Sequence, residues 1–436
     1  MSYRRLGLCL FATAALVASL SAMPASASST PAVDNDSTQA FTTTFGGAKA
    51  QPSARTIPHW FGQAVNPHNG VTYGYNMVGA DPSLQTTTTI EVDITPIIVH
   101  LQGRTYDGTS VVNATLASPQ FALNDYGSTT GATAAGSFPN LPALTRGDGG
   151  LLSQADAGNQ LQLEDATMRA QFNQTGRSGY HVILHPNVLP AVTIDVPQSQ
   201  GVLITGARGL VWADIDITWW ATRIGELKNS ADPTHLPLYL TNDVYLHIGP
   251  NVLNCCVIGF HGASEVVGHG TGSTHGNGNQ VIQTYAWASY MSPSRYARPN
   301  GGTDWAVQDI HAVSHEIAEW GDDPFINNTV EPWLTPTAPQ YGCTGVMETG
   351  DPVVGIGFAK GTNTFEQGPN PNGTQSADGA YHPEDEALLP WFMRFPSNAT
   401  GSEPNQSGVG GRYTLMGDLN PFPGSASRRR AARPHR

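Results

Sequence analysis

Alternation of apolar and polar residues is the strongest signal in the first half of the chain. Residues 87–99 alternate and are rich in β-branched side chains, which predicts a strand. Other short apolar runs predict strands at 180–184, 192–196, 202–204, 210–219 and 236–248. Helical spacing of apolar residues is found at 160–172 and, more clearly, at 304–320. The pattern therefore predicts an α+β protein dominated by strands and loops.

The segment 304–320 is expected to form a buried helix. Its apolar residues recur at spacings of three and four and surround the axis almost completely: Trp305, Ile310, Val313, Ile317 and Trp320. Thr303 or Asp304 is the expected N-cap, and Gly321 the expected C-cap. Polar side chains on such a helix need partners, because burial of an unpartnered polar group is costly.

Low-complexity segments indicate how the rest of the chain is organised. Loops are expected at 127–150, at 262–280 with His269 and His275, and at 360–380, all rich in Gly or other turn-forming residues. No internal repeat is found. We predict a single large domain over residues 56–425.

The N-terminus has the pattern of an export signal. Arg4 and Arg5 precede an apolar run, and Ala25-Ser26-Ala27 follows as a cleavage site, so residues 1–27 are predicted to be a signal peptide. Residues 28–55 are predicted to be a flexible leader, and the arginine-rich residues 426–436 a disordered tail. The predicted location is therefore extracellular.

Charge and hydropathy exclude two classes of partner. The 436 residues include 21 Lys and Arg against 34 Asp and Glu, a net charge of −13, which argues against nucleic-acid binding. Beyond the signal no apolar run is long enough to cross a membrane, so no integral segment is expected. The sequence does not indicate an oligomeric state.

Export makes disulfide bonds possible. Cys9 would leave with the signal, so three cysteines remain. Cys255 or Cys256 is expected to pair with Cys343. A ring between the two adjacent cysteines is the alternative.

Candidate chemistry is concentrated on the predicted buried helix. His311, His315 and Glu319 are spaced by four and share one helix face. With Glu316 they resemble the H-E-x-x-H motif of zincin metalloenzymes, with Glu319 in place of the second histidine. His315 and Glu319 are the predicted metal ligands, and Glu316 is the predicted general base. His311 is an optional member.

Further ligands must come from other segments. Glu348 and Asp351 flank a glycine before Pro352, and either can be the third ligand while the other orients a histidine. His261 is a candidate fourth ligand or transition-state donor. Imidazole and carboxylate favour Zn²⁺, with Mn²⁺ or Ca²⁺ as alternatives.

A purely structural role for these residues is the alternative to a metal site. The same residues can form a buried hydrogen-bonded network, or a solvated helix face. His261 is equally consistent with a structural role. His269 and His275 are expected to be loop residues, and Trp219 with Trp220 to belong to the core.

Several short motifs occur in an order that resembles the plant EXORDIUM/phosphate-induced proteins. They are Phe260-His261, Tyr285-Ala286-Trp287, His315 to Glu319, Asp323 to Asn327, and Glu348 to Asp351, within about residues 255–358. The chain is also similar to exported bacterial proteins with the same H-E-I-A-E-W segment. The resemblance implies an extracellular or cell-wall-associated protein with His261, His315, Glu316, Glu319, Glu348 and Asp351 in one site. It implies no reaction, and His311 stands where the plant motif has a small residue.

Three functions are consistent with these features. The first is an exported metal-dependent hydrolase with a cell-wall or polypeptide substrate. The second is a non-catalytic, EXORDIUM-like extracellular protein in which the polar cluster is structural. The third is a glycosidase that uses two carboxylates such as Glu316 and Glu348, and it requires an open cleft between them.

Overall fold

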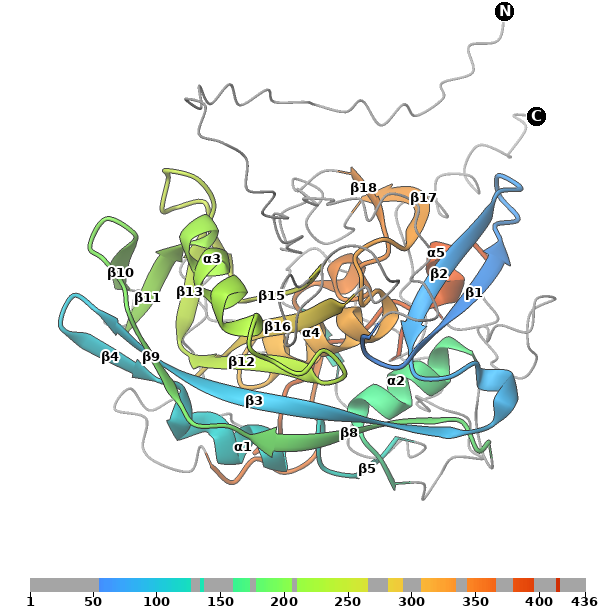
Figure 1. The fold of residues 1–436 in the computed structure, drawn as a ribbon, viewed down its shortest axis with the longest axis horizontal. Helices are drawn as coiled ribbons and strands as arrows, with labels where there is room; N and C mark the ends of the chain where they lie inside the picture. Colours follow the sequence, from blue (N-terminus) through green and yellow to red (C-terminus); the bar gives the residue numbers. More distant parts are fainter. Residues whose placement is uncertain are drawn as a thin grey trace, which may run out of the picture.

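The fold is shown in Figure 1 as a computed structural model. The structure describes residues 55–126, 134–136, 160–172, 178–205, 210–265, 281–292, 307–334, 343–365, 379–395 and 413–415. The predicted signal peptide, nearly all of the leader, the basic tail and both His269 and His275 lie outside these residues. The predicted α+β, strand-rich class is confirmed.

The largest sheet has seven strands and is built around the long strand β3 (Thr87–Leu101), which runs along the long axis of the molecule (Figure 1). Its path is β15 (Gly259–Glu265), β16 (Ile282–Tyr290), β12 (Leu236–Asn242), β3 and β4 (Arg104–Asp107), and both β8 (His181–Val188) and β9 (Val192–Asp195) also pair with β3. Strand β12 is parallel to β16 and β3, and β3 is parallel to β8 and β9. Strands β15 and β4 are antiparallel to their neighbours.

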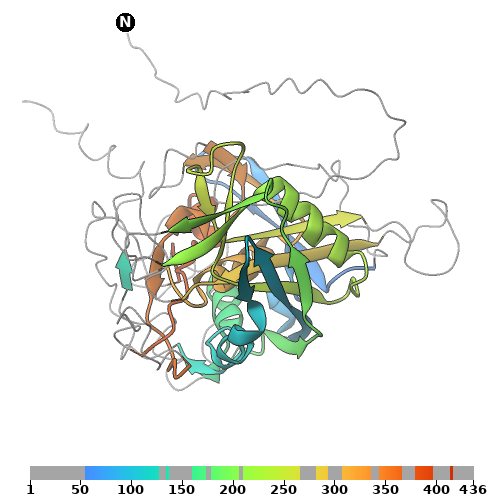
Figure 2. The ribbon, with the colours of Figure 1, turned by 90° about the vertical axis from the view of Figure 1, so that its left-hand side faces the viewer.

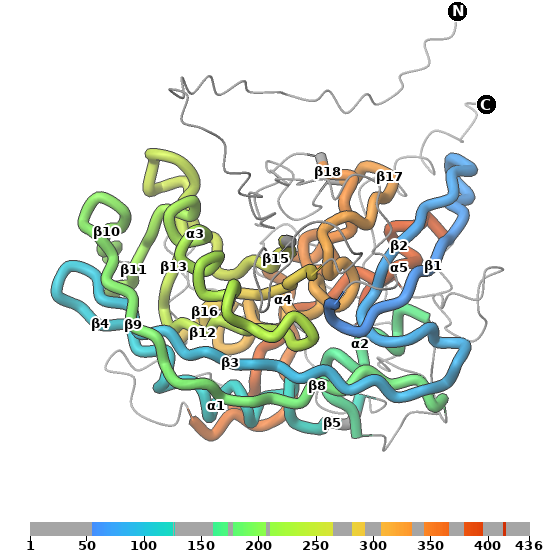
Figure 3. Tube along the Cα trace, in the orientation of Figure 1, coloured from blue at the N-terminus to red at the C-terminus, as the bar shows by residue number. Residues whose placement is uncertain are grey.

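Smaller sheets flank this one. Four strands form the second sheet: β10 (Gly201–Thr205), β11 (Val211–Asp216), β13 (Val244–His247) and β14 (Cys255–Val257). The hairpin of β1 (His59–Val65) and β2 (Thr72–Val78) stands at the opposite end of the molecule (Figure 3). Three short pairs complete the described sheets: β17 (Thr329–Leu334) with β18 (Cys343–Val346), β19 (Ile356–Phe358) with β6 (Ala134–Gly136), and β5 (Asn124–Asp125) with β7 (Gln160–Leu161).

The helices of the described chain are short. They are α1 (Val112–Ala117), α2 (Leu163–Gln171), α3 (Ile217–Lys228), α4 (His311–Asp322) and α5 (Leu389–Phe392), with 3₁₀ turns η1 (Pro82–Leu84), η2 (Gly108–Val111) and η5 (Asp351–Val353). Helix α4 packs on β15 and β16, while α3 packs against β11, β13 and β16. Figure 2 is viewed from the end of the molecule that carries β4 and β10. It shows α3 beside the strands on which it packs, β11 and β13 among them. None of the described helices has the length and apolar character needed to cross a membrane.

Strand β16 separates two parts of the core, because alternate residues of a strand point to opposite faces. Ala286 and Ala288 join the apolar cluster that contains α4, whereas Tyr285 and Trp287 join the cluster that contains α3. The small alanines allow α4 to approach the sheet closely. His261 of β15 lies directly opposite Ala286, so its imidazole shares the face that α4 covers.

Two predicted strands are interrupted in the structure. The predicted strand 210–219 ends at Asp216, whose side chain accepts a hydrogen bond from the backbone N–H of Trp219 at 2.9 Å and caps helix α3. This cap starts the helix three residues before the end of the apolar run, so the strand is shorter than the run predicts. The predicted strand 236–248 is divided at Asp243, which has a φ of 55°, so β12 and β13 enter different sheets.

The limits of the buried helix also differ from those predicted. Helix α4 begins at His311 and continues through Gly321, so this glycine is not a C-cap. A Cβ atom at Gly321 would lie 2.1 Å from Oε1 of Glu164 on α2. The glycine therefore allows α2 and α4 to pack closely. The predicted N-caps, Thr303 and Asp304, lie outside the described residues.

The expected disulfide to Cys343 is wrong. Cys255 and Cys256, adjacent on β14, are bonded to each other. Each of these sulfur atoms has its partner in the neighbouring residue, so neither can form a second disulfide bond.

Candidate metal centre

Helix α4 brings the predicted site residues together with β15 and the turn before η5. Six side chains meet there, and each residue has at most 4% of its surface exposed: His261, His315, Glu316, Glu319, Glu348 and Asp351. The helix contributes three of them, since Glu319 lies four residues after His315 and three after Glu316, and both spacings place side chains on one helix face. The fold therefore brings side chains from three distant segments into one buried region.

One group of possible ligands is formed by His315, Glu319 and Asp351. Their ligand atoms lie within 4.8 Å of one another. Nε2 of His315 is 3.1 Å from Oε2 of Glu319. The other oxygen of Glu319, Oε1, accepts hydrogen bonds from the backbone N–H groups of Gly350 at 3.0 Å and Asp351 at 3.3 Å. These bonds fix the carboxylate and connect α4 to the turn.

A second group is formed by His261, Glu316 and Glu319, whose ligand atoms also lie within 4.8 Å of one another. Nδ1 of His261 is 3.5 Å from Oε2 of Glu316 and 3.6 Å from Oε2 of Glu319. On its other side, Nε2 of His261 is 4.0 Å from Oε2 of Glu348. Glu319 is therefore common to both groups, while Glu348 lies behind His261.

Sequence reasoning missed Glu384. Its carboxylate contacts Nδ1 of His315, and its Oε1 lies 3.2 Å from Nε2 of His311 and accepts the N–H of Gly355 at 2.7 Å. The backbone N–H of Glu384 donates to Oγ of Ser314 at 2.9 Å. The predicted site range 255–358 was therefore too short. The acidic run 384–386 was a signal in the sequence, but it has no helical or motif spacing that would link it to His315.

Two glycines give the site its close packing. A Cβ atom at Gly350 would lie 2.3 Å from Nδ1 of His315, and one at Gly259 would lie 2.3 Å from Oε1 of Glu316. No larger residue fits at either position without a displacement of these side chains. The close packing of His315 and Glu316 therefore requires glycine at both positions.

The electrostatics of the site are dominated by carboxylates. Burial opposes the protonation of His315, but the charges of Glu319 and Glu384 and their hydrogen bonds raise its pKa well above the ordinary value. Burial opposes the ionisation of Glu384, but His311 and His315 lower its pKa. A cluster of carboxylates of this kind stabilises a positive charge that lies among them, whether on a histidine or on a bound cation.

Buried cationic side chains of the described chain are engaged elsewhere. Arg169 donates to the carbonyl oxygens of Ser178 and Tyr180, and Lys228 donates to Oγ of Ser264. Imidazole nitrogens and carboxylate oxygens are the donor types that divalent metals use in proteins. By donor type, proximity and charge, both groups can bind a metal ion.

The structure also distinguishes between the sequence alternatives. Asp351, not Glu348, belongs to the group that contains His315. His311 contacts Glu384 and is in neither group. The ring of His261 contacts Glu316 through one nitrogen and Glu348 through the other. This arrangement does not favour the glycosidase hypothesis, which needs a sugar between the two carboxylates.

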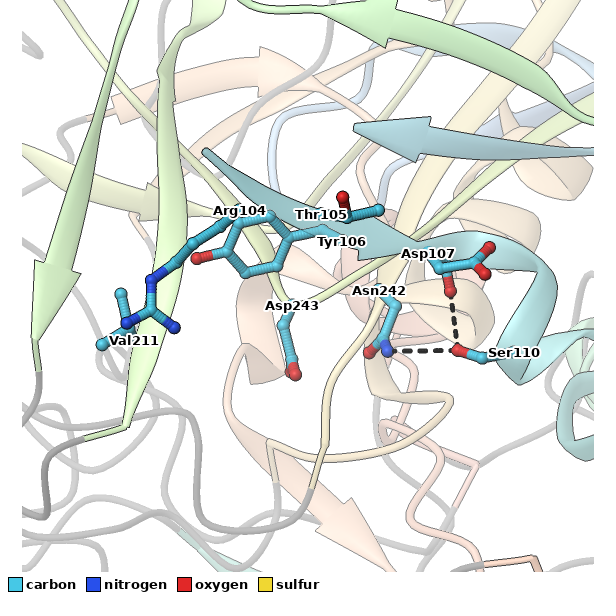
Figure 4. A pocket seen from close by; sticks show the side chains of 8 residues that line it. All are labelled: Arg104, Thr105, Tyr106, Asp107, Ser110, Val211, Asn242 and Asp243. Atoms are coloured by element: carbon cyan, nitrogen blue, oxygen red, sulfur yellow. Dashed lines mark hydrogen bonds between the residues drawn. The ribbon is translucent and has the colours of Figure 1, made fainter. Parts of the chain in front are cut away.

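A separate cavity of about 400 Å³ lies at the end of β12 (Figure 4). It is lined by Arg104, Thr105, Tyr106, Asp107, Ser110, Val211, Asn242 and Asp243. Several of its polar groups form hydrogen bonds within the protein. Ser110 donates to the carbonyl oxygen of Asp107 at 2.6 Å, and Asp243 accepts two hydrogen bonds from Ser292. None of the metal-site candidates lines this cavity.

Comparisons of the chain with family models, with curated proteins and with solved structures find no match.

Proposed function

We propose that the protein is an exported metal-dependent hydrolase whose centre lies between α4, β15 and the turn at Glu348–Asp351. The observation that carries the proposal is the convergence of His315, Glu319 and Asp351, with His261 and Glu316 beside them. A buried cluster of this composition requires a positive charge for stability.

Each residue has a defined task in a site with one ion. His315, Glu319 and Asp351 hold the ion, which supplies Lewis-acid activation of a substrate carbonyl and of water. Glu316 follows His315 in the chain and is the group placed to accept a proton. His261 lies 3.5 Å from Glu316 and stabilises negative charge that develops on the substrate.

Zinc is the proposed metal, since one imidazole and two carboxylates form a three-ligand set that leaves a position for substrate. Carboxylate-rich sites also accept Mn²⁺, and Ca²⁺ prefers more oxygen ligands than this group contains. The proposed substrate is a polypeptide, by analogy with other helices of the H-E-x-x-H type. The proposed extracellular location rests on the signal-like N-terminus and on the EXORDIUM-like motifs.

One observation favours a second candidate, a non-catalytic extracellular protein. The site residues are almost completely buried, and Glu348 and Asp351 are the most exposed of them at 4% each. A structural role for a polar network needs no access for substrate, whereas hydrolysis needs a path to the ion.

Metal analysis of variants tests the proposal. The full chain is stripped with a chelator, incubated with Zn²⁺ or Mn²⁺, and analysed for bound metal and for cleavage of unfolded polypeptides. We expect bound metal in the parent, less bound metal in His315→Ala, and the parent's content in His185→Ala, a surface histidine that also contacts a carboxylate, Glu91. Glu316→Gln is expected to lower cleavage at least 100-fold.

The outcomes separate the two candidates. A parent protein that binds neither metal overturns the proposal. Bound metal without hydrolysis of peptides or esters leaves a metal-stabilised, non-catalytic protein. A folding check by circular dichroism on each variant shows whether a loss of metal reflects the site or the fold.

A further inference from the structure

We infer that the centre holds two divalent ions bridged by the carboxylate of Glu319. The inference deepens the proposed function and rests on it, since both need metal binding by α4. It assigns the second group, His261 with Glu316 and Glu319, as a metal site in its own right.

The two groups meet at one atom. Oε2 of Glu319 lies 3.1 Å from Nε2 of His315 and 3.6 Å from Nδ1 of His261. Separations of this size are typical of neighbouring ligands on one ion, because bonds of about 2.0–2.2 Å place adjacent ligand atoms about 3 Å or slightly more apart. Oε2 of Glu319 is thus close enough to both His315 and His261 to share an ion with each of them.

One ion cannot bind both imidazoles in the positions that they have in the structure. Two ligands of the same ion are separated by at most twice the bond length, about 4.4 Å. His261 and His315 each group with Glu319 within 4.8 Å, yet the two histidines do not fall into a common group. They therefore approach Glu319 from different sides, which is the geometry of a bridging carboxylate.

The orientation of Glu319 supports the bridge. Its Oε1 accepts the N–H groups of Gly350 and Asp351, so the carboxylate is anchored at one oxygen and directs the other toward both histidines. The anchor comes from the turn that also supplies Asp351 to the first group. Helix α4 thus places its carboxylate between a ligand from β15 and a ligand from the turn.

Both imidazoles have the arrangement expected of metal ligands. His315 directs Nε2 to Glu319, and its Nδ1 contacts the carboxylate of Glu384. His261 directs Nδ1 to Glu319, and its Nε2 lies 4.0 Å from the carboxylate of Glu348. A ligating histidine characteristically has a carboxylate at its second nitrogen, which fixes the ring and increases its basicity. A carboxylate thus faces the second nitrogen of each histidine, hydrogen-bonded to His315 and 4.0 Å away from His261, which is consistent with an ion on each side of Glu319.

The second ion changes the tasks of two residues. In the site with two ions Glu316 and His261 are ligands, so Glu316 is no longer the proton acceptor and His261 no longer stabilises charge on the substrate. Paired ions in hydrolytic enzymes lie about 3.5–4 Å apart and act on both sides of the reacting group. The one-ion and two-ion forms are therefore chemically distinct states of this centre.

Metal stoichiometry tests the inference without any activity measurement. The metal-free full chain is titrated with Mn²⁺, and bound metal is measured by calorimetry and elemental analysis, with electron paramagnetic resonance to detect coupling between ions. We expect two equivalents and a spin-coupled spectrum for the parent. Glu316→Gln is expected to bind one equivalent with an uncoupled spectrum. Glu91→Gln, a surface carboxylate that also contacts a histidine, is expected to keep two equivalents.

Failure of this inference and failure of the proposed function have different signatures. Saturation of the parent at one equivalent overturns the two-ion centre and leaves the one-ion hydrolase in place. Absence of binding overturns both. Two coupled ions in a folded Glu316→Gln variant contradict the assignment of the second group. The stoichiometry of the parent decides the question even if a variant does not fold.

Discussion

Glu384 contacts Nδ1 of His315 across 69 residues of sequence, and this contact turns Nε2 of the imidazole toward Glu319. The contact fixes which nitrogen of His315 faces the proposed metal. Glu384 is itself held by the N–H of Gly355 and by His311, so the orientation of His315 depends on a network that lies behind the proposed ligands.

Glu384→Gln is predicted to weaken Zn²⁺ binding about 10- to 100-fold, the usual effect of removing a carboxylate behind a ligating histidine. Glu386→Gln is the matched control. Glu386 is a buried carboxyl group two residues from Glu384, and burial, followed by the charge of Glu384, raises its pKa well above the ordinary value. Competition with a chromogenic chelator measures both affinities. An equal loss in both variants would show that the effect is not specific to His315.

Gly350→Ala is predicted to displace His315 from Glu384, because the new Cβ would lie 2.3 Å from Nδ1 of the ring. We expect at least a tenfold loss of metal affinity and a decrease of about 1–3 kcal/mol in the free energy of unfolding. Gly345→Ala is the control, since its nearest neighbour would be at an ordinary 3.5 Å. Unchanged metal affinity in Gly350→Ala would contradict the described packing of His315.

Thr284→Val is predicted to destabilise the protein by about 1–3 kcal/mol, because it leaves the buried indole N–H of Trp320 without its acceptor. In the structure this N–H donates to Oγ1 of Thr284 at 2.9 Å and joins α4 to β16. Thr193→Val, on the exposed side of β9, is the control with the same change of side chain. Denaturant unfolding measures the difference, and equal effects would exclude a role for this bond.

Asp214→Asn is predicted to stabilise the protein at neutral pH. Burial raises the pKa of Asp214 from 3.8 to about 6, although the neighbouring His247 lowers it in part. The folded state therefore holds this proton more tightly than the unfolded state. The resulting stability is complete below pH 3.8 and is lost as the pH rises through about 6. Between pH 4 and 7 the stability difference is expected to move by about 2 kcal/mol in favour of the variant.

Thermal unfolding at several pH values checks this prediction. Asp195→Asn is the control, because Asp195 also contacts a histidine, His100 at 2.8 Å, but its side chain is 86% exposed. Exposed pairs of this kind contribute about 1 kcal/mol or less, so the control is expected to show little dependence on pH. A pH-independent difference between Asp214→Asn and the parent would contradict a raised pKa in the folded state.

Local patterns predicted the elements that depend on neighbouring residues. The alternation at 87–99 corresponds to β3, and the helical spacing at 160–172 corresponds to α2. The placement of His315, Glu316 and Glu319 on one short helix follows from the turn of the α-helix alone. The start of α3 was not predicted, because one capping bond from Asp216 decides where the strand ends.

By itself the sequence determined the strand-rich class, the acidic character and the spacing of the candidate ligands along α4, since these depend on composition and on residues within one or two turns. Only the tertiary structure decided that Asp351 and not Glu348 joins His315, that Glu384 stands behind it, and that Glu319 faces His261 as well. The physical reason is that contacts between distant segments depend on how side chains of different sizes pack together. The alanines of β16 and the glycines at 259 and 350 set these distances, and no periodicity in the sequence records them.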